Sequence, residues 1–318
     1  MLIFFVGLIC LSLGSEKSIH PFEISVWKNL FNPTWEYREV ILFSVRLPRL
    51  ILGFLVGGCL ALSGLVFQGL LRNPLADPFI LGVSGGAGLV AVIIQLLGFH
   101  NPIVLVFGAF IGGLGAVFLV NILAGTGGKI DRGKLILAGV VLNAFFAAFI
   151  SLLLIFAGKD LPRIFAWLMG SLSVPDPALF RPLSLLSFVA FFVIWAFSHR
   201  LNLIALGDHQ AYHLGIDPEL TKKIALFGAS FLTAVAVSLA GMVGFIGMFV
   251  PHGARLLFGY DHKVLVPITF AMGAALLMMT DTLARISPTG VELPVGTITA
   301  LFGAPFFLSL LLKSDRVS

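Results

Sequence analysis

The chain has 318 residues, of which 58% are apolar and only 11% are charged, and its mean hydropathy is +1.06. Soluble domains carry about 25% charged residues, so this composition excludes an ordinary water-soluble protein and indicates a membrane protein. The net charge of +5 is too modest to indicate a nucleic-acid partner.

Apolar, charge-free stretches recur along the chain, and a bilayer-spanning helix needs about 20 such residues. The stretches are 2–13, 50–71, 79–99, 102–124, 135–158, 182–198, 224–254, 264–280 and 293–312. The stretch 224–254 is too long for one straight span, and Pro251 with the series Gly241, Gly244 and Gly247 can divide it into two. The sequence therefore predicts an all-α integral membrane protein with ten transmembrane helices.

The first stretch, 2–13, has twelve apolar residues, which fits a short or truncated first span or the core of a signal peptide. No basic residue precedes it, and a signal peptide carries a positive segment there, so we favour a span. We expect a single polytopic domain over residues 1–318.

Small residues and thiols lie inside these stretches. Glycines spaced four apart let membrane helices approach closely, and they predict a tightly packed bundle. The pairs are Gly53 and Gly57, Gly82 and Gly86, and Gly108 and Gly112. Cys10 and Cys59 have no metal-ligand spacing, so we expect buried thiols and no metal site.

Acidic residues are nearly missing from the apolar stretches. Only Asp281 lies in an apolar neighbourhood, and Arg285 follows it one helical turn later, which predicts a local ion pair. Ion-coupled carriers usually bury acidic residues along their pathway, so an ion-coupled secondary transporter is a disfavoured alternative.

Two motifs offer enzymatic alternatives. LAGTGGKI (123–130) ends like a phosphate-binding loop, but Leu123 and Ile130 replace the required glycine and hydroxyl residue, so we reject a nucleotide site. The G-x-S-G sequence at Ser84 resembles the nucleophile motif of rhomboid-like intramembrane proteases, with a histidine such as His252 as the base. Such a match arises easily in a glycine-rich span, where helix packing is the simpler interpretation.

Basic residues cluster at 127–134, at 199–223 and in the C-terminal KSDR. If ten spans alternate from a cytoplasmic N-terminus, all three clusters face the cytoplasm, as the positive-inside rule prefers.

Several blocks, read in order, resemble one family. The blocks are RLPR (46–49), SGLVFQGLLRNPLADPFILGVSGGAG (63–88), LAGV (137–140), WLMGSL (167–172), LGDHQAYHLGI (206–216), GMVGFIGMFVPHGARLLFGYDHKVLVP (241–267), DTLAR (281–285) and ELPVGTITALFGAPFFLSLL (292–311). This set resembles the FecCD-type permease subunit of ABC importers, which take up iron–siderophores, haem or vitamin B12. The resemblance covers residues 46–312.

The resemblance implies a type II ABC importer permease fold in a bacterial or archaeal cytoplasmic (inner) membrane. It implies a homodimer, two cytoplasmic ATP-binding cassette subunits that bind ATP and Mg²⁺, and a periplasmic or lipoprotein substrate-binding protein. This chain would then be no enzyme and would hold no cofactor of its own. Iron(III)–siderophore is the commonest cargo, haem and vitamin B12 come next, and a small oxyanion is a further candidate.

The polar segment 205–217 resembles the family's coupling helices, which contact the ATPase. The residues that carry this match are Leu206, Gly207, Asp208, His209, Gln210, Ala211, Leu214 and Gly215. If 205–213 is one helix, Leu206 and Leu214 share a face that supplies apolar contact, and Asp208 with His209 forms a polar rim. His209 and His213 depart from the family pattern, which favours acidic or small residues there.

Two further sets carry over from the family. Asn73 and Leu75 match a cytoplasmic gate, and Arg132 with Gly133 matches a second strip of that gate, where small hydroxyl residues are more usual.

Arg46, Arg49 and Arg285 match arginines that receive acidic side chains of the binding protein. Pro48 suggests that a helix begins there, and its dipole would oppose the nearby cations by about 0.3–1 kcal/mol each. An anionic partner would offset this cost, and lipid phosphate is the alternative.

Overall fold

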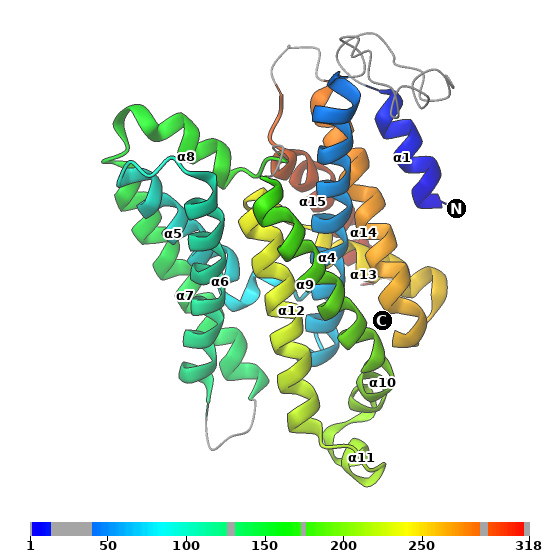
Figure 1. The fold of residues 1–318 in the computed structure, drawn as a ribbon. Helices are drawn as coiled ribbons and strands as arrows, with labels where there is room; N and C mark the ends of the chain where they lie inside the picture. The colour runs from blue at the N-terminus through cyan, green and yellow to red at the C-terminus, as the bar shows by residue number, and fades with distance from the viewer. Residues whose placement is uncertain (1, 14–39, 126–130, 173–175, 287–291, 315–318) are drawn as a thin grey trace.

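The computed structural model describes residues 2–13, 40–125, 131–172, 176–286 and 292–314 (Figure 1). Helices and their connections account for these ranges, and no strand occurs within them. The predicted all-α architecture is therefore confirmed. The rejected phosphate-loop motif lies partly outside the described residues, at 126–130.

The helices follow one another in this order: α1 (Leu2–Ser12), a π-helical turn η1 (Leu42–Arg46), α4 (Leu47–Leu71), a 3₁₀ turn η2 (Pro78–Leu81), α5 (Val83–Leu96), α6 (Pro102–Ala124), α7 (Arg132–Leu154), a 3₁₀ turn η3 (Gly158–Asp160), α8 (Leu161–Leu168), α9 (Pro177–Ala196), α10 (Ser198–Leu206), α11 (Asp208–His213), α12 (Pro218–Ala240), α13 (Ile246–Phe258), α14 (His262–Arg285) and α15 (Val295–Ser314).

Every predicted apolar stretch contains a helix, but the helices differ in length. In the described ranges, six are long and apolar enough to cross a membrane, and they are Leu42–Leu71, Pro102–Ala124, Arg132–Leu154, Pro177–Ala196, Pro218–Ala240 and His262–Arg285. The apolar helices α5 and Val295–Pro305 are shorter, as are α1 and α13. The molecule is a multi-pass membrane protein, and the count of ten spans stays a prediction.

The stretch 224–254 divides at its glycines. Helix α12 ends at Ala240, and Gly241 takes a left-handed φ of 71°, which glycine adopts at little cost. Pro251 lies inside α13, so the predicted role of this proline in the break is wrong. A proline in the second turn of a 13-residue helix removes only one backbone donor, and α13 continues past it.

Helix α4 is the centre of the bundle and packs against α12, α13 and α14 (Figure 1). Of its most apolar window, 83% is buried within the chain, against 17% for α7 and 11% for α9. Glycines allow the close packing, since a Cβ on Gly86 of α5 would lie 2.5 Å from the carbonyl oxygen of Gly112 in α6. Gly57 meets the backbone of Gly273 in the same way, so the predicted tight bundle is confirmed.

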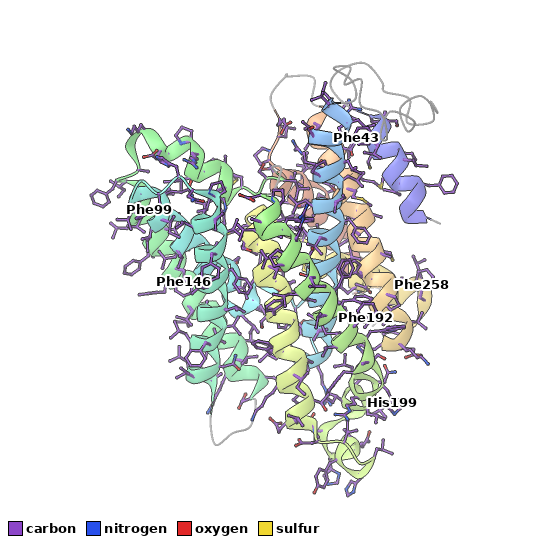
Figure 2. The ribbon with its side chains drawn as sticks, viewed as in Figure 1. Phe43, Phe99, Phe146, Phe192, His199 and Phe258 are labelled. Carbon is purple, nitrogen blue, oxygen red and sulfur yellow. The ribbon has the colours of Figure 1, made fainter. Side chains whose placement is uncertain are left out.

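Helices α5, α6, α7 and α8 form a second group beside α12 (Figure 1). Figure 2 shows phenylalanine side chains along the outside of the bundle, and Phe99 and Phe192 are among the exposed ones. Exposed apolar surface on this scale needs lipid or a partner subunit to cover it.

Candidate functional site

Helices α10 and α11 project from one end of the bundle, at the foot of α12 (Figure 1). We call residues 198–215 the coupling hairpin, after the role that the family resemblance implies for part of it. Helix α10 ends at Leu206, Gly207 turns the chain with φ 134° and ψ 149°, and α11 begins at Asp208. The expected single helix over 205–213 is therefore wrong, because Gly207 adopts a conformation that no L side chain favours. Gly215 follows α11 with φ 84°, a left-handed conformation that suits glycine and ends the helix.

The outer face of the hairpin carries large exposed apolar side chains. Leu206 is 60% exposed, Tyr212 71% and Leu214 57%, whereas Ala211 is fully buried and anchors α11. Gln210 is exposed beside them. His209 and His213 are also exposed, and their rings lie 4.5 Å apart at 66°. This face therefore exposes large apolar side chains beside polar ones.

Asp208 turns toward the spans of its own chain. Its Oδ2 accepts a hydrogen bond from Lys222 Nζ of α12 at 2.6 Å. Its Oδ1 accepts from Arg132 Nη2 of α7 at 3.1 Å, and Arg72 Nη2 lies 4.0 Å away. Burial alone would raise the pKa of Asp208, but the bond from Lys222 and the three positive charges outweigh burial and hold the pKa below its usual value. Sequence reasoning placed Asp208 at a rim with His209, and it missed this cluster.

The basic side chains around Asp208 include Arg132, which is one of the predicted gate residues. Arg132 Nε donates to the carbonyl oxygen of Leu70 at 2.8 Å, near the end of α4. Arg72, which follows α4, donates to the carbonyl oxygen of Ile204 in α10 at 3.0 Å. A predicted coupling residue and a predicted gate residue, Asp208 and Arg132, are thus in direct contact.

The other gate residues lie in the turn after α4 and at the start of α7. Asn73 Oδ1 accepts from the backbone N–H of Leu75 at 2.9 Å, which shapes the turn and leaves the Leu75 side chain exposed. Gly133 is the second residue of α7. Within the described ranges, no hydrogen bond joins Asn73 or Leu75 to Arg132 or Gly133.

A second anchor joins α10 to α14. Asn202 Nδ2 donates to Asp261 Oδ1 at 2.7 Å, and Asn202 Oδ1 accepts from the backbone N–H of His262 at 2.9 Å. The bonds from Asn202 and from the Lys263 N–H keep the pKa of Asp261 below its usual value. The coupling hairpin is therefore tied to four spans, α4, α7, α12 and α14.

The three predicted docking arginines lie at the opposite end, inside the fold. Arg49 Nη2 and Arg285 Nε bind the two oxygens of Asp281 at 2.9 and 3.1 Å. Arg49 Nη1 also binds Glu292 at 2.8 Å, and Arg46 Nη1 donates to the Leu11 carbonyl oxygen of α1 at 2.8 Å. The predicted Asp281–Arg285 pair is confirmed, and Arg49 and Glu292 are the partners that sequence reasoning missed.

The expected helix start at Pro48 is wrong. The helix that holds Arg46 and Arg49 does not begin at Pro48, because it runs back through the π-helical turn Leu42–Arg46. A π turn accommodates a proline, which has no N–H to donate. The arginines therefore do not face a helix N-terminus, and Arg46 and Arg49 are only 4% and 7% exposed. The charge of Arg49 is balanced within the chain by Asp281 and Glu292, and Arg46 donates to the backbone of α1.

The alternative chemistries gain no support from the described residues. Ser84 lies buried at the start of α5, and no hydrogen bond joins it to His252 of α13. Cys10 and Cys59 are free and buried, as predicted. In the ranges that the structure covers, no group of three or more potential metal ligands converges.

The chain matches the model of the FecCD transport family over residues 2–313. It is 42% identical over 283 residues to the cobalamin import system permease protein BtuC of Halobacterium salinarum, covering 87% of this chain and 74% of that protein. It is 39% identical to the hemin transport system permease protein HmuU of Yersinia pestis, covering 86% and 83%. It is also 39% identical to the Fe(3+) dicitrate transport system permease protein FecD of Escherichia coli, covering 86% and 85%.

The fold agrees with a solved structure described as an inward-facing conformation of a metal-chelate type ABC transporter. The TM-score is 0.82 at 33% identity, and the match covers 98% of this chain and 96% of that one. Because the family model and the relatives span nearly all of the chain, the chain belongs to the FecCD transport family.

Proposed function

We propose that this chain is the transmembrane permease subunit of an ABC importer for a metal chelate. One observation carries the proposal beyond family membership. The coupling hairpin presents an exposed apolar face outward, and it is tied inward to α4, α7, α12 and α14 through Asp208 and Asn202. A projecting element that is fixed to several spans suits the transfer of movement from a separate motor subunit.

The partners follow from the surfaces that the chain leaves open. Two ATPase subunits, which bind ATP and Mg²⁺, dock on the coupling hairpins of a homodimer and supply the energy, so this chain has no catalytic activity of its own. The poorly buried faces of α7 and α9 are available to a second copy or to lipid. A periplasmic or lipoprotein substrate-binding protein docks at the opposite end, near Arg49, Arg285 and Glu292.

The cargo we propose is an iron(III)–siderophore, with haem and vitamin B12 as the alternatives to be tested. The support is the range of chelates in the names of the relatives, namely cobalamin, hemin and iron dicitrate. A bulky, partly apolar chelate also suits a bundle that is rich in glycine and phenylalanine, with 35 and 31 residues.

The test is reconstitution of the chain in liposomes with its ATPase and binding protein. ATP should drive uptake of one of the three chelates offered separately, and Ser84→Ala should leave uptake intact. Proteolytic activity of the purified chain that disappears in Ser84→Ala would contradict the proposal, as would uptake without ATPase subunits.

Docking on the hairpin has its own test, the double change Leu206→Asp with Leu214→Asp. Burying one leucine contributes roughly 1.5–3 kcal/mol, so two aspartates should weaken ATPase binding at least tenfold. Leu97→Asp, an exposed leucine in the turn after α5 at the end of the bundle away from the hairpin, serves as the control and should retain the ATPase. Unchanged ATPase binding and full uptake in the double variant would show that the hairpin is an ordinary solvated loop.

A further inference from the structure

We propose that Asp208 is the positioning residue through which movement of α11 reaches α4, α7 and α12. This inference rests on the proposed function, because it assigns the internal path for a movement that the ATPase would deliver. The observation is the convergence of three basic side chains from three different segments on one carboxylate of the coupling hairpin.

Both oxygens of Asp208 are occupied, and each faces a different span. Oδ2 binds Lys222 of α12, and Oδ1 binds Arg132 of α7. Arg132 in turn donates to the Leu70 carbonyl oxygen, so a shift of Asp208 also reaches α4. Buried leucines lie beside the Arg132 and Lys222 side chains and limit their movement on that side. These leucines are Leu71, Leu135 and Leu226.

A movement of α11 changes the charge balance around Asp208. In the described ranges, Asp208 is the only carboxylate within ion-pair distance of Arg72 or Arg132, and Lys222 has Glu219 as a second partner at 2.9 Å. When α11 carries Asp208 away, three like charges at the ends of α4, α7 and α12 repel one another. When Asp208 returns, it draws those ends together.

The two halves of the hairpin are anchored differently, and Gly207 lies between them. Asn202 holds α10 to α14 by neutral and charge-assisted hydrogen bonds, whereas Asp208 holds α11 by ion pairs. Gly207 has backbone freedom that any other residue lacks at φ 134°. Helix α11 can therefore turn relative to α10 and move Asp208 against the three cations.

The first experiment measures transport per ATP hydrolysed by the full complex in liposomes. Coupling between two sites typically corresponds to about 5- to 150-fold, so Asp208→Asn should lower the ratio about tenfold while ATPase binding stays intact. Asp208→Glu, which keeps the charge, should recover part of the ratio. Asp217→Asn is the matched control, because Asp217 follows α11 closely in the chain and its side chain caps α12, which asparagine does equally well.

Three results of this experiment would overturn the proposal. A wild-type ratio in Asp208→Asn would show that the contact transmits nothing. Loss of ATPase binding would place Asp208 in the docking surface instead. An equal loss in Asp217→Asn would show a general loosening of the loop.

The second experiment needs no transport and separates this inference from the proposed function. Amide hydrogen exchange of the full chain in detergent micelles should rise in α11 and in the first turn of α7 for Asp208→Asn, and in neither for Asp217→Asn. Arg132→Gln should reproduce the effect, and adding it to Asp208→Asn should raise exchange no further. If hydrogen exchange in α7 is unchanged in Asp208→Asn, the inference is overturned, even where ATP-driven uptake has been established. If exchange rises as expected but the complex takes up no chelate, the proposed function fails and the role of the Asp208 contact is retained.

Discussion

The two ends of the bundle each hold a carboxylate among basic side chains, but solvent reaches the two carboxylates to very different degrees. The Asp208 side chain is 43% exposed, and the Asp281 side chain is 3% exposed. Asp281 forms ion pairs with two arginines, Arg49 and Arg285, whose side chains are almost fully buried. A buried pair is costly to separate, whereas an exposed pair exchanges easily with water. The difference indicates that one end is held fixed while the other can rearrange.

The strongest test of this comparison removes the buried carboxylate. Asp281→Asn leaves Arg49 and Arg285 buried without their shared counter-charge, and breaking a buried pair in this way costs about 3–5 kcal/mol. We expect a clearly lower thermal unfolding midpoint in detergent. Asp208→Asn is the control and should shift the midpoint much less. Equal shifts for the two variants would remove the distinction between the ends.

A smaller effect is expected at Glu292, whose side chain is 60% exposed and binds Arg49. Glu292→Gln should cost about 0.2–1 kcal/mol in stability, as exposed ion pairs do. It also frees one edge of Arg49 for an acidic side chain of the binding protein, so the affinity of that protein should rise.

The control for this change is Asp160→Asn, a carboxamide substitution in η3; within the described residues, the acids that bind Arg49 are Asp281 and Glu292 and not Asp160. Charge reversal of Arg49 is less informative, because it would place a third acid beside Asp281 and Glu292. If Glu292→Gln leaves the affinity for the binding protein and its salt dependence unchanged, the arginines stabilise the fold and do not contact that protein.

The smallest effect concerns pH at the hairpin. The pKa of Asp208 is below its usual value of about 3.9, so its contribution to stability is present above that value and is lost only as pH falls through the lower folded-state pKa. Between pH 8 and 5, hydrogen exchange of α11, corrected for intrinsic rates, should therefore change little. A transition within this range would show that a group other than Asp208 controls the hairpin.

The sequence predicted local features well, because lipid forces backbone groups to bond within each helix. Apolar stretches therefore became helices, and the Asp281–Arg285 pair appeared at its i, i+4 spacing. Pro251 misled the prediction, since a proline near a helix start is tolerated, and the backbone of Gly241 was the actual break.

The partners of the two carboxylates could not be predicted in this way. Asp208 and Arg132 are 76 residues apart, and Arg49 and Asp281 are 232 apart. No periodicity connects such positions. Helix packing brings them together, because α7 and α12 both pack on α6, and α4 packs on α14. The family resemblance singled out Arg132 and Asp208 separately, but it gave no sign that they touch.

The glycine contacts of α4 have a consequence for variation among related sequences. A methyl group on Gly57 or Gly64 would collide with the backbone of α14 or of α13, so even alanine is excluded where the helices meet. Helix α9 turns most of its surface outward and is free of such constraints apart from a few buried positions such as Ile194. Tolerance to substitution should therefore rise steeply from the axis of the molecule to its periphery. When a library of random substitutions is selected for folded protein, variants in α4 should be removed much more often than variants in α9.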